Sequence, residues 1–300
     1  MRHPNLYQRP LEPNDLDRVV ELFTATVPNE RFSRSDIRVM TFEDPDYDPE
    51  LSLVALDGGV IVGFAQGIVR NYGDSSTRAA IKWFATDSSA RRTGVMTTLF
   101  DRIEDQIQRF GAVAIQIGYT PPSYVFPGVD ANATEAAAFL VRRGYVGCGS
   151  THTLRCNLRD ILHKAPSGIA GVSIERALRS DLQSVLAFVR NEFPQWTREI
   201  AVCFRKNPIG LFLARRAHEL IGIASTGGYA SGRGWIGPVG VALASRGCGI
   251  GTQLLRRSLS DLREQGHTVA VVPYDCTDGF FQRACGATIG NRYVCFRKTI

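Results

Sequence analysis

The stretch 239–252, with the sequence VGVALASRGCGIGT, joins an apolar run to an amphipathic segment that begins at Ile250. A glycine-rich turn at the start of a helix leaves backbone N–H groups unpaired and directed at one place, where the helix dipole adds partial positive charge. Gly249 and Gly251 let a ligand approach the backbone closely, and Arg246 can pair with an anion. The stretch therefore predicts a phosphate or pyrophosphate site. It has neither the Gly-Lys-Ser/Thr ending of a P-loop nor the later acidic residue of a dinucleotide-binding motif.

The same pattern occurs earlier in the chain. The residues RRTG at 91–94 precede a predicted helix over 95–110, as residues 246–249 precede one over 250–265. Three pairs of landmarks are each 155 positions apart, namely Gly94 and Gly249, Gly111 and Gly266, and Tyr119 and Tyr274. Repetition at a fixed spacing indicates two copies of one module.

Each copy follows one order of elements: a strand, one or two helices, two paired strands, a long strand, the glycine-containing loop, a helix, a strand, a second helix and closing strands. This order predicts an α/β (α+β) fold in which helices flank a mixed sheet. The breaker-rich residues KAPSG at 164–168 mark the boundary between the copies. We therefore expect a first module over 1–163, a linker over 164–170 and a second module over 171–300.

The composition is that of a globular protein, with 300 residues of which 44% are hydrophobic and 21% charged. A net charge of +6 is spread along the chain without a long basic run, which argues against a nucleic-acid partner and agrees with an anionic cofactor. The seven cysteines form no Cys-x-x-Cys pair, so we expect reduced thiols and no metal site. Neither a signal-peptide pattern nor a membrane-length apolar stretch is present. We expect a cytoplasmic protein, a monomer or homodimer, with no membrane partner.

The element order, with Arg-x-x-Gly-x-Gly between the fourth strand and the third helix, resembles the GNAT superfamily of acyltransferases. The duplication resembles the tandem-domain members of that superfamily, and the resemblance covers nearly all of both copies. It implies that each sheet is splayed and that acetyl-CoA binds as co-substrate, with its pyrophosphate on the loop and its pantetheine arm along the fourth strand. The residues implied to bind acetyl-CoA are Val239, Gly240, Val241, Arg246, Gly247, Cys248, Gly249, Ile250, Gly251 and Thr252.

The two copies differ at the last glycine of the motif. Met96 stands in the first copy where Gly251 stands in the second. A methionine side chain there is expected to crowd the backbone donors that contact the pyrophosphate. We therefore expect a degenerate first module and a second module that binds acetyl-CoA productively. A first loop that flexes and still binds is the alternative.

The resemblance also implies a tyrosine that protonates the leaving thiolate, but Gln282 and Leu140 stand at that position in the two copies. Tyr274, at the end of the fifth strand of the second module, is the first substitute acid, and Cys276 is the second. Asp275 could act as a base or contact the cofactor. A structural role for Tyr274 stays open, because the first copy has a tyrosine at the same position.

Two groups of residues could recognise the acceptor. Acidic residues are concentrated in the run EDPDYDPE at 43–50, where Glu43 and Asp46 could attract a cationic amine, although charge runs are commonly solvated loops. In the second module, Glu192 and Trp196 lie in the matching helical region and could bind an amine. Their helical spacing also suits plain surface and core positions.

An insertion distinguishes the first copy. It has 13 extra residues between Tyr119 and its last helix, including the proline-rich segment 121–130. Long ordered loops in compact domains commonly serve function. We expect this insertion, with Tyr124 and Asp130, to form part of the substrate pocket or of the interface between modules.

Together these features predict acetyl transfer from acetyl-CoA to a primary amine of a small, polar, cationic molecule. An aminoglycoside-type antibiotic, with kasugamycin as the named example, is the specific expectation, and it rests on family analogy and on the acidic residues. A peptide or protein N-terminus is the alternative acceptor. A non-catalytic acyl-CoA-binding regulatory protein is the alternative class, because the expected tyrosine is missing from both copies.

Overall fold

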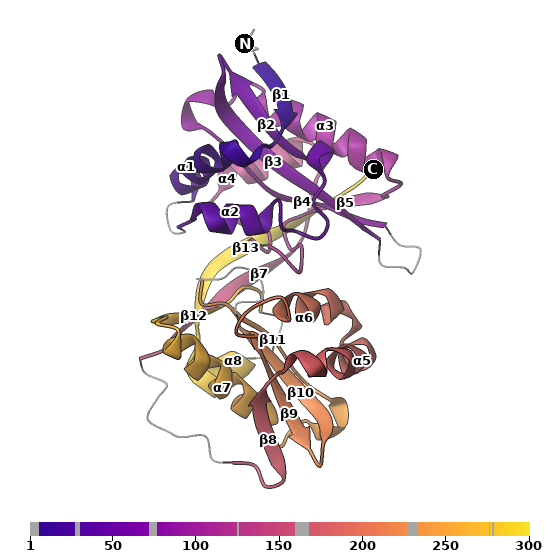
Figure 1. Cartoon of the computed structure of the whole chain (residues 1–300). Helices are drawn as coiled ribbons and strands as arrows, with labels where there is room; N and C mark the ends of the chain where they lie inside the picture. The colour runs from indigo at the N-terminus through magenta and orange to yellow at the C-terminus, as the bar shows by residue number, and fades with distance from the viewer. Residues whose placement is uncertain are drawn as a thin grey trace. The chain divides into compact units, whose positions relative to one another are not determined.

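The computed structural model describes residues 6–27, 31–71, 77–124, 126–159, 168–226, 233–275, 277 and 279–300. The chain divides into two compact units (Figure 1). The first unit contains Met1–Thr120, Tyr124–Ser150 and Tyr293–Ile300, and the second contains Pro121–Ser123 and Thr151–Arg292. Both units are helices packed on a β-sheet, which confirms the predicted α/β class and the two-copy organisation.

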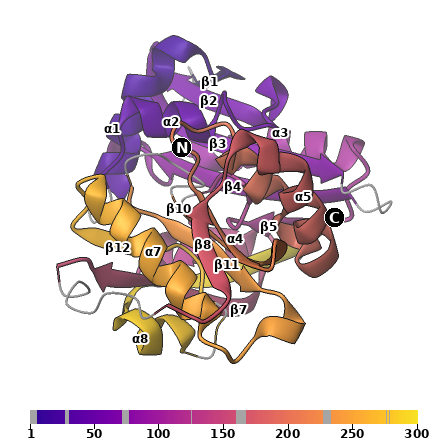
Figure 2. The ribbon, with the colours of Figure 1, turned by 60° about the horizontal axis from the view of Figure 1, so that its bottom comes forward.

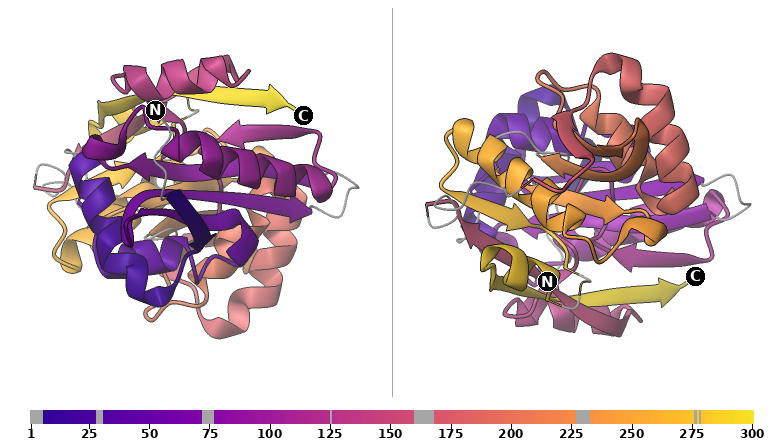
Figure 3. Two further views of the ribbon diagram at one scale, coloured as in Figure 1. Left: turned by 90° about the horizontal axis from the view of Figure 1, so that it is seen from above. Right: turned by 90° about the horizontal axis from the view of Figure 1, so that it is seen from below.

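The first unit is built around a sheet in which β1 to β4 are antiparallel neighbours and β5 lies parallel to β4. Figure 3 shows its helices on both sides of the strands. Its elements are β1 (Leu6–Pro10), α1 (Leu16–Thr26), α2 (Arg34–Met40), β2 (Ser52–Asp57), β3 (Val60–Asn71), β4 (Thr77–Thr86), α3 (Val95–Arg109), β5 (Ala114–Ile117), β6 (Val129–Asp130), α4 (Thr134–Arg142) and the first residues of β7 (Val146–Asn157).

Helix α3 packs closely on β3 because two glycines of the strand face it. A Cβ at Gly63 would lie 2.4 Å from Val95, and one at Gly67 would lie 2.7 Å from Ile103. The apolar residues of α3 recur at helical spacing and join the main core cluster of the unit. The sequence therefore fixes how near this helix comes to the sheet, and with it the position of the loop that starts the helix.

The second unit repeats this arrangement with a four-stranded antiparallel sheet in the order β11-β10-β9-β8. Helix α7 lies against that sheet (Figure 2). Between β11 and β12 the structure describes one isolated parallel bridge, Trp235 to Val271. The elements are β8 (Val172–Arg176), α5 (Leu182–Glu192), α6 (Thr197–Cys203), β9 (Leu211–Arg216), β10 (Glu219–Thr226), β11 (Ile236–Val241), α7 (Ile250–Glu264), β12 (Val269–Val272), α8 (Phe280–Cys285) and β13 (Thr288–Thr299).

The closing strands are exchanged between the two halves of the sequence. In the first unit, Arg297–Thr299 of β13 pair antiparallel with Ala114–Gln116 of β5. In the second unit, Leu154–Asn157 of β7 pair antiparallel with β12. The units defined by contacts therefore differ from a simple cut near the expected linker over 164–170, of which 164–167 lie outside the described residues.

The predicted helices 95–110 and 250–265 appear as α3 and α7, each ending one residue earlier than expected. Among the described residues, no helix is long and apolar enough to cross a membrane. The same residues contain no group of three or more side chains suited to hold a metal ion.

Candidate functional site

The two glycine-containing loops have the same backbone geometry where they join the helices that follow them. Gly94 precedes α3 with φ +96°, and Gly249 precedes α7 with φ +80°, a left-handed conformation that favours glycine. The first helical hydrogen bonds are donated by Thr98 to Gly94 O and by Gln253 to Gly249 O. The three N–H groups before each of these donors have no partner within the helix, so both loops present the donor set expected of an anion site.

Aromatic rings border the loop and strand of the second unit. A Cβ at Gly251 would lie 3.4 Å from the ring of Phe280 in α8. On β11, a Cβ at Gly240 would lie 2.6 Å from Trp196 and 2.7 Å from Phe193, and these two rings stack with centroids 4.6 Å apart. Gly240 therefore makes room for aromatic side chains. The predicted acceptor residue Trp196 lies beside the predicted cofactor strand.

Other predicted residues of the second unit are held by polar contacts at this strand end. Arg246 donates from Nε to the carbonyl oxygen of Val241 at 3.0 Å. Glu192 accepts from the backbone N–H of Leu243 at 3.3 Å. Cys248 is exposed. The structure thus brings Glu192, Trp196 and the loop together around β11.

The predicted catalytic residues follow β12. Asp275 accepts from the N–H and the hydroxyl of Thr277, at 2.9 and 2.6 Å. Its other oxygen lies 3.5 Å from Nε2 of His152. Sequence spacing gave no signal for this imidazole–carboxylate pair, because His152 lies in β7, 123 positions before Asp275 and in the other predicted copy. Cys276 lies outside the described residues, and Tyr274 is half-buried.

A cavity of about 840 Å³ lies in the first unit, at its own copy of the loop. Its walls come from β4 between Lys82 and Thr86, from the loop, from the inserted segment and from α4. Met96 is part of the wall and also packs on the core cluster. The methionine therefore does not close the cavity. Arg91 and Arg92 of the loop pair with Glu135 at 3.2 and 2.8 Å.

The inserted segment contributes to this cavity. Phe126, Gly128, Val129 and Asp130 line it, and Asp130 accepts from the backbone N–H of Asn132 at 2.8 Å. Tyr124 is buried instead against Tyr119, with ring centroids 5.4 Å apart. Of the two residues predicted in the insertion, Asp130 thus lies at the cavity.

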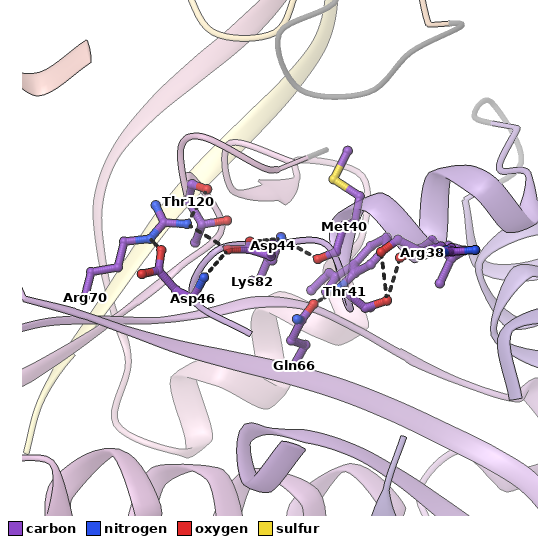
Figure 4. Close-up of polar contacts among 11 residues, drawn as sticks. Arg38, Met40, Thr41, Asp44, Asp46, Gln66, Arg70, Lys82 and Thr120 are labelled. Atoms are coloured by element: carbon purple, nitrogen blue, oxygen red, sulfur yellow. Dashed lines mark hydrogen bonds and ion pairs between the residues drawn. The ribbon is translucent and has the colours of Figure 1, made fainter. Parts of the chain in front are cut away.

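Two acids of the run 43–50, Asp44 and Asp46, are paired with neighbouring cations (Figure 4). Asp46 accepts from Nε of Arg70 at 2.6 Å, and Asp44 accepts from Nζ of Lys82 at 2.5 Å. Both carboxylates are buried or nearly so. Exposed Glu43 pairs with Arg38 at 2.9 Å. The run is therefore not a free anionic patch, and Asp46 is engaged within the fold.

Lys82 is the functional candidate that the sequence pattern did not reveal. Its side chain is 1% exposed, and Nζ also donates to the carbonyl oxygen of Met40, at the end of α2. Burial lowers the pKa of Lys82 to about 8, although the negative charge of Asp44 opposes this effect. A buried lysine with a shifted pKa on a cavity wall is a candidate functional residue.

The fold and the two helix-starting loops define a tandem α/β protein with a candidate anion site in each unit. The model of the acetyltransferase (GNAT) family matches residues 16–125 and 175–287. The chain therefore belongs to the GNAT acetyltransferase family. A comparison with curated proteins finds no match.

Three solved structures share the fold over almost the whole chain. A glucosamine N-acetyltransferase region of a fungal multi-domain GH3 β-N-acetylglucosaminidase has a TM-score of 0.83 and 22% identity, covering 97% of this chain and 38% of that one. A GCN5-related N-acetyltransferase from Sphaerobacter thermophilus has a TM-score of 0.77 and 20% identity, covering 100% and 97%. A tandem GNAT protein of the clavulanic acid biosynthesis pathway has a TM-score of 0.72 and 15% identity, covering 98% of each chain.

Proposed function

We propose that this protein transfers the acetyl group of acetyl-CoA to a primary amine of a small, polar, cationic molecule. The observation that carries the proposal is the cavity of about 840 Å³ that opens at the helix-starting loop of the first unit and has Asp130 in its lining. Its volume falls in the range of cofactor and substrate sites. At one end of the cavity, the loop before α3 offers backbone N–H donors for a pyrophosphate. Asp130 offers a partner for an ammonium group.

Both loops are proposed to bind acetyl-CoA, with transfer taking place in the first unit. The second loop has all three residues of the motif, and residues 239–241 and 246–252 remain its proposed contacts. The first loop has Met96 but opens onto the cavity. Because Met96 leaves that space open, the first module is proposed to be competent, in contrast to the expectation from sequence.

The chemistry asks little of the protein beyond binding and orientation. The amine nitrogen attacks the thioester carbonyl, and the thiolate is a tolerable leaving group. The aromatic and apolar residues Trp83, Phe84 and Ala85 of β4 line the cavity and would exclude water from the reacting groups. Asp130 would hold the acceptor by its positive charge.

An aminoglycoside-type antibiotic is the proposed acceptor class, with kasugamycin as a specific candidate and antibiotic resistance as the consequence of acetylation. Amino sugars share the required chemistry, and the fungal neighbour is described as a glucosamine N-acetyltransferase. Asp130 supports this proposal, whereas the acidic run 43–50 does not, because Asp44 and Asp46 are paired with cations. A peptide N-terminus and a non-catalytic acyl-CoA-binding role are the alternatives. We further propose a cytoplasmic monomer or homodimer that binds no nucleic acid.

Thiol release from acetyl-CoA, measured with a panel of aminoglycosides, kasugamycin, glucosamine and short peptides, tests the function. The expected result is turnover with an amino-sugar acceptor. Turnover with peptides alone would show that the acceptor is a peptide N-terminus and not an amino sugar. Acetyl-CoA binding without any turnover would favour the regulatory alternative.

One bulky substitution in each loop tests the site. Gly94→Trp should abolish turnover, and Gly251→Trp should leave it largely intact while removing acetyl-CoA from the second loop. Equilibrium dialysis counts the bound acetyl-CoA in each variant. If Gly251→Trp abolishes turnover and Gly94→Trp does not, transfer belongs to the second unit, as the sequence predicted.

A further inference from the structure

Lys82 occupies the point where the two central strands of the first unit separate. The parallel pairing of β4 with β5 ends at Ile81 and Ile117, and Lys82 is the next residue of β4. Both Lys82 and Ile117 line the cavity. Lys82 therefore lies on the cavity wall at the point where β4 and β5 stop pairing, among the apolar residues of a buried strand.

The chain makes sparing use of lysine, with four lysines among its 35 basic residues. Arginine stays charged at every pH that proteins experience, whereas a buried lysine can lose its proton. Burying an ammonium group costs several kcal/mol unless it is well paired, and Lys82 is paired with Asp44 and with the carbonyl oxygen of Met40. A lysine in this ion pair, unlike an arginine, leaves the position able to lose and regain a proton.

Burial and the positive charge of Arg70 favour neutral Lys82, whereas the carboxylates of Asp44 and Asp46 favour its ammonium form. Asp44, its partner, also lies 3.7 Å from Nη2 of Arg70. Arg70 in turn pairs with Asp46 and donates to the carbonyl oxygen of Thr120 (Figure 4). The charged groups that act on the ammonium are thus Asp44, Asp46 and Arg70. When Lys82 loses its proton, Arg70 still pairs with both carboxylates, and the group then carries one net negative charge.

We propose that Lys82 is the proton acceptor for the acceptor amine in the first unit; this rests on the function proposed above. Neutral Lys82 takes a proton from the acceptor ammonium, giving a free amine and the Lys82 ammonium. The nitrogen lone pair forms the bond to the thioester carbon, and the carbon–sulfur bond breaks with its electron pair on sulfur. One N–H proton of the attacking nitrogen passes to the thiolate, and Lys82 returns its own proton to solvent.

The lowered pKa of Lys82 suits this role, because a base works best when its pKa lies near the working pH and near that of the proton donor. Hydrogen bonds to Asp44 and to Met40 O would then stabilise the ammonium that forms during the reaction. An acceptor whose amine is already neutral would not need this proton transfer.

The test compares Lys82→Met with Lys82→Arg, which keeps the positive charge but cannot accept a proton. Both should lower kcat/KM at about pH 7.5 by about 100-fold. With a weakly basic acceptor that is neutral at the assay pH, the loss should shrink to less than about threefold. Lys206→Met is the matched control, because burial also lowers the pKa of Lys206, which belongs to the second unit. It should leave the pH profile unchanged.

A second readout does not depend on turnover. Heteronuclear NMR of the four lysine side chains should show one that titrates near pH 8 and disappears in Lys82→Met, while acetyl-CoA affinity stays unchanged. Asp44→Asn should move that titration to lower pH. An active enzyme whose rate and pH profile survive Lys82→Met would overturn the role of Lys82 alone. A wild-type protein that binds acetyl-CoA but acetylates nothing would overturn the proposed function, and this inference with it.

Discussion

The ammonium of Lys298, in the last strand of the chain, donates a 2.6 Å hydrogen bond to Glu104 of α3. Arg143 and the hydroxyl of Tyr145 donate to the same carboxylate. This cluster ties the C-terminal segment into the first unit, although the sequence places that segment after the whole of the second module.

Glu104→Gln should destabilise the first unit by about 2 kcal/mol, because two cations lose their counter-charge. Burial acts to raise the pKa of Glu104, but hydrogen bonds from Arg143 and Lys298 outweigh it and lower that pKa below its ordinary 4.5. The wild-type contribution is therefore complete above about pH 4.5 and is lost as pH falls further. Hydrogen exchange of α3 and β5 peptides between pH 3 and pH 7 measures it. Equal pH dependence in Glu104→Gln and wild type would contradict this assignment.

Ending the chain at Arg292 should destabilise the fold of the first unit and leave most of the second unit folded. The deleted residues include buried Tyr293 and Phe296 and the partner strand of β5. Exchange of β5 amides should become rapid, and acetyl-CoA binding at the first loop should be lost. Peptides from β9 and β10 serve as the internal control. Protection of β5 that equals that of the full chain would show that the strand exchange does not support the first unit.

Gly67→Ala should destabilise the first unit by about 1–3 kcal/mol, because the added Cβ would lie 2.7 Å from Ile103. Combining it with Ile103→Ala should cost less than the sum of the two single changes, since the smaller residue makes room. Denaturant unfolding of the four proteins gives the coupling. Additive free energies would mean that the helix shifts away from the strand instead.

Tyr274→Phe should change kcat/KM by less than about threefold, because transfer is proposed for the first unit. Sequence reasoning made Tyr274 the first substitute acid, for which loss of the hydroxyl would cost about 100-fold. Asp130→Asn is the informative partner variant, since Asp130 lines the cavity, and it should raise KM for a cationic acceptor. The kcat and KM of both variants, measured with one acceptor, show which unit carries out the transfer.

Sequence alone predicted the elements whose signals are local. The glycines at 94 and 249 and the periodicity after them placed α3 and α7 almost to the residue. The direction of the Met96 side chain was not predictable, because it depends on how that residue packs on the core. Likewise, Lys82 and Asp44 are 38 positions apart, so nothing in their spacing revealed that they meet in a buried ion pair.

The exchanged closing strands make each half of the sequence incomplete without the other. A chain cut in the expected linker would yield two fragments, each of which carries the strand that completes the sheet of the other. Such fragments should behave as a natural complementation pair, inactive when expressed singly and restored by co-expression. For the same reason, neither copy of this chain contains every strand of its own sheet, so neither could be transplanted as a self-sufficient domain.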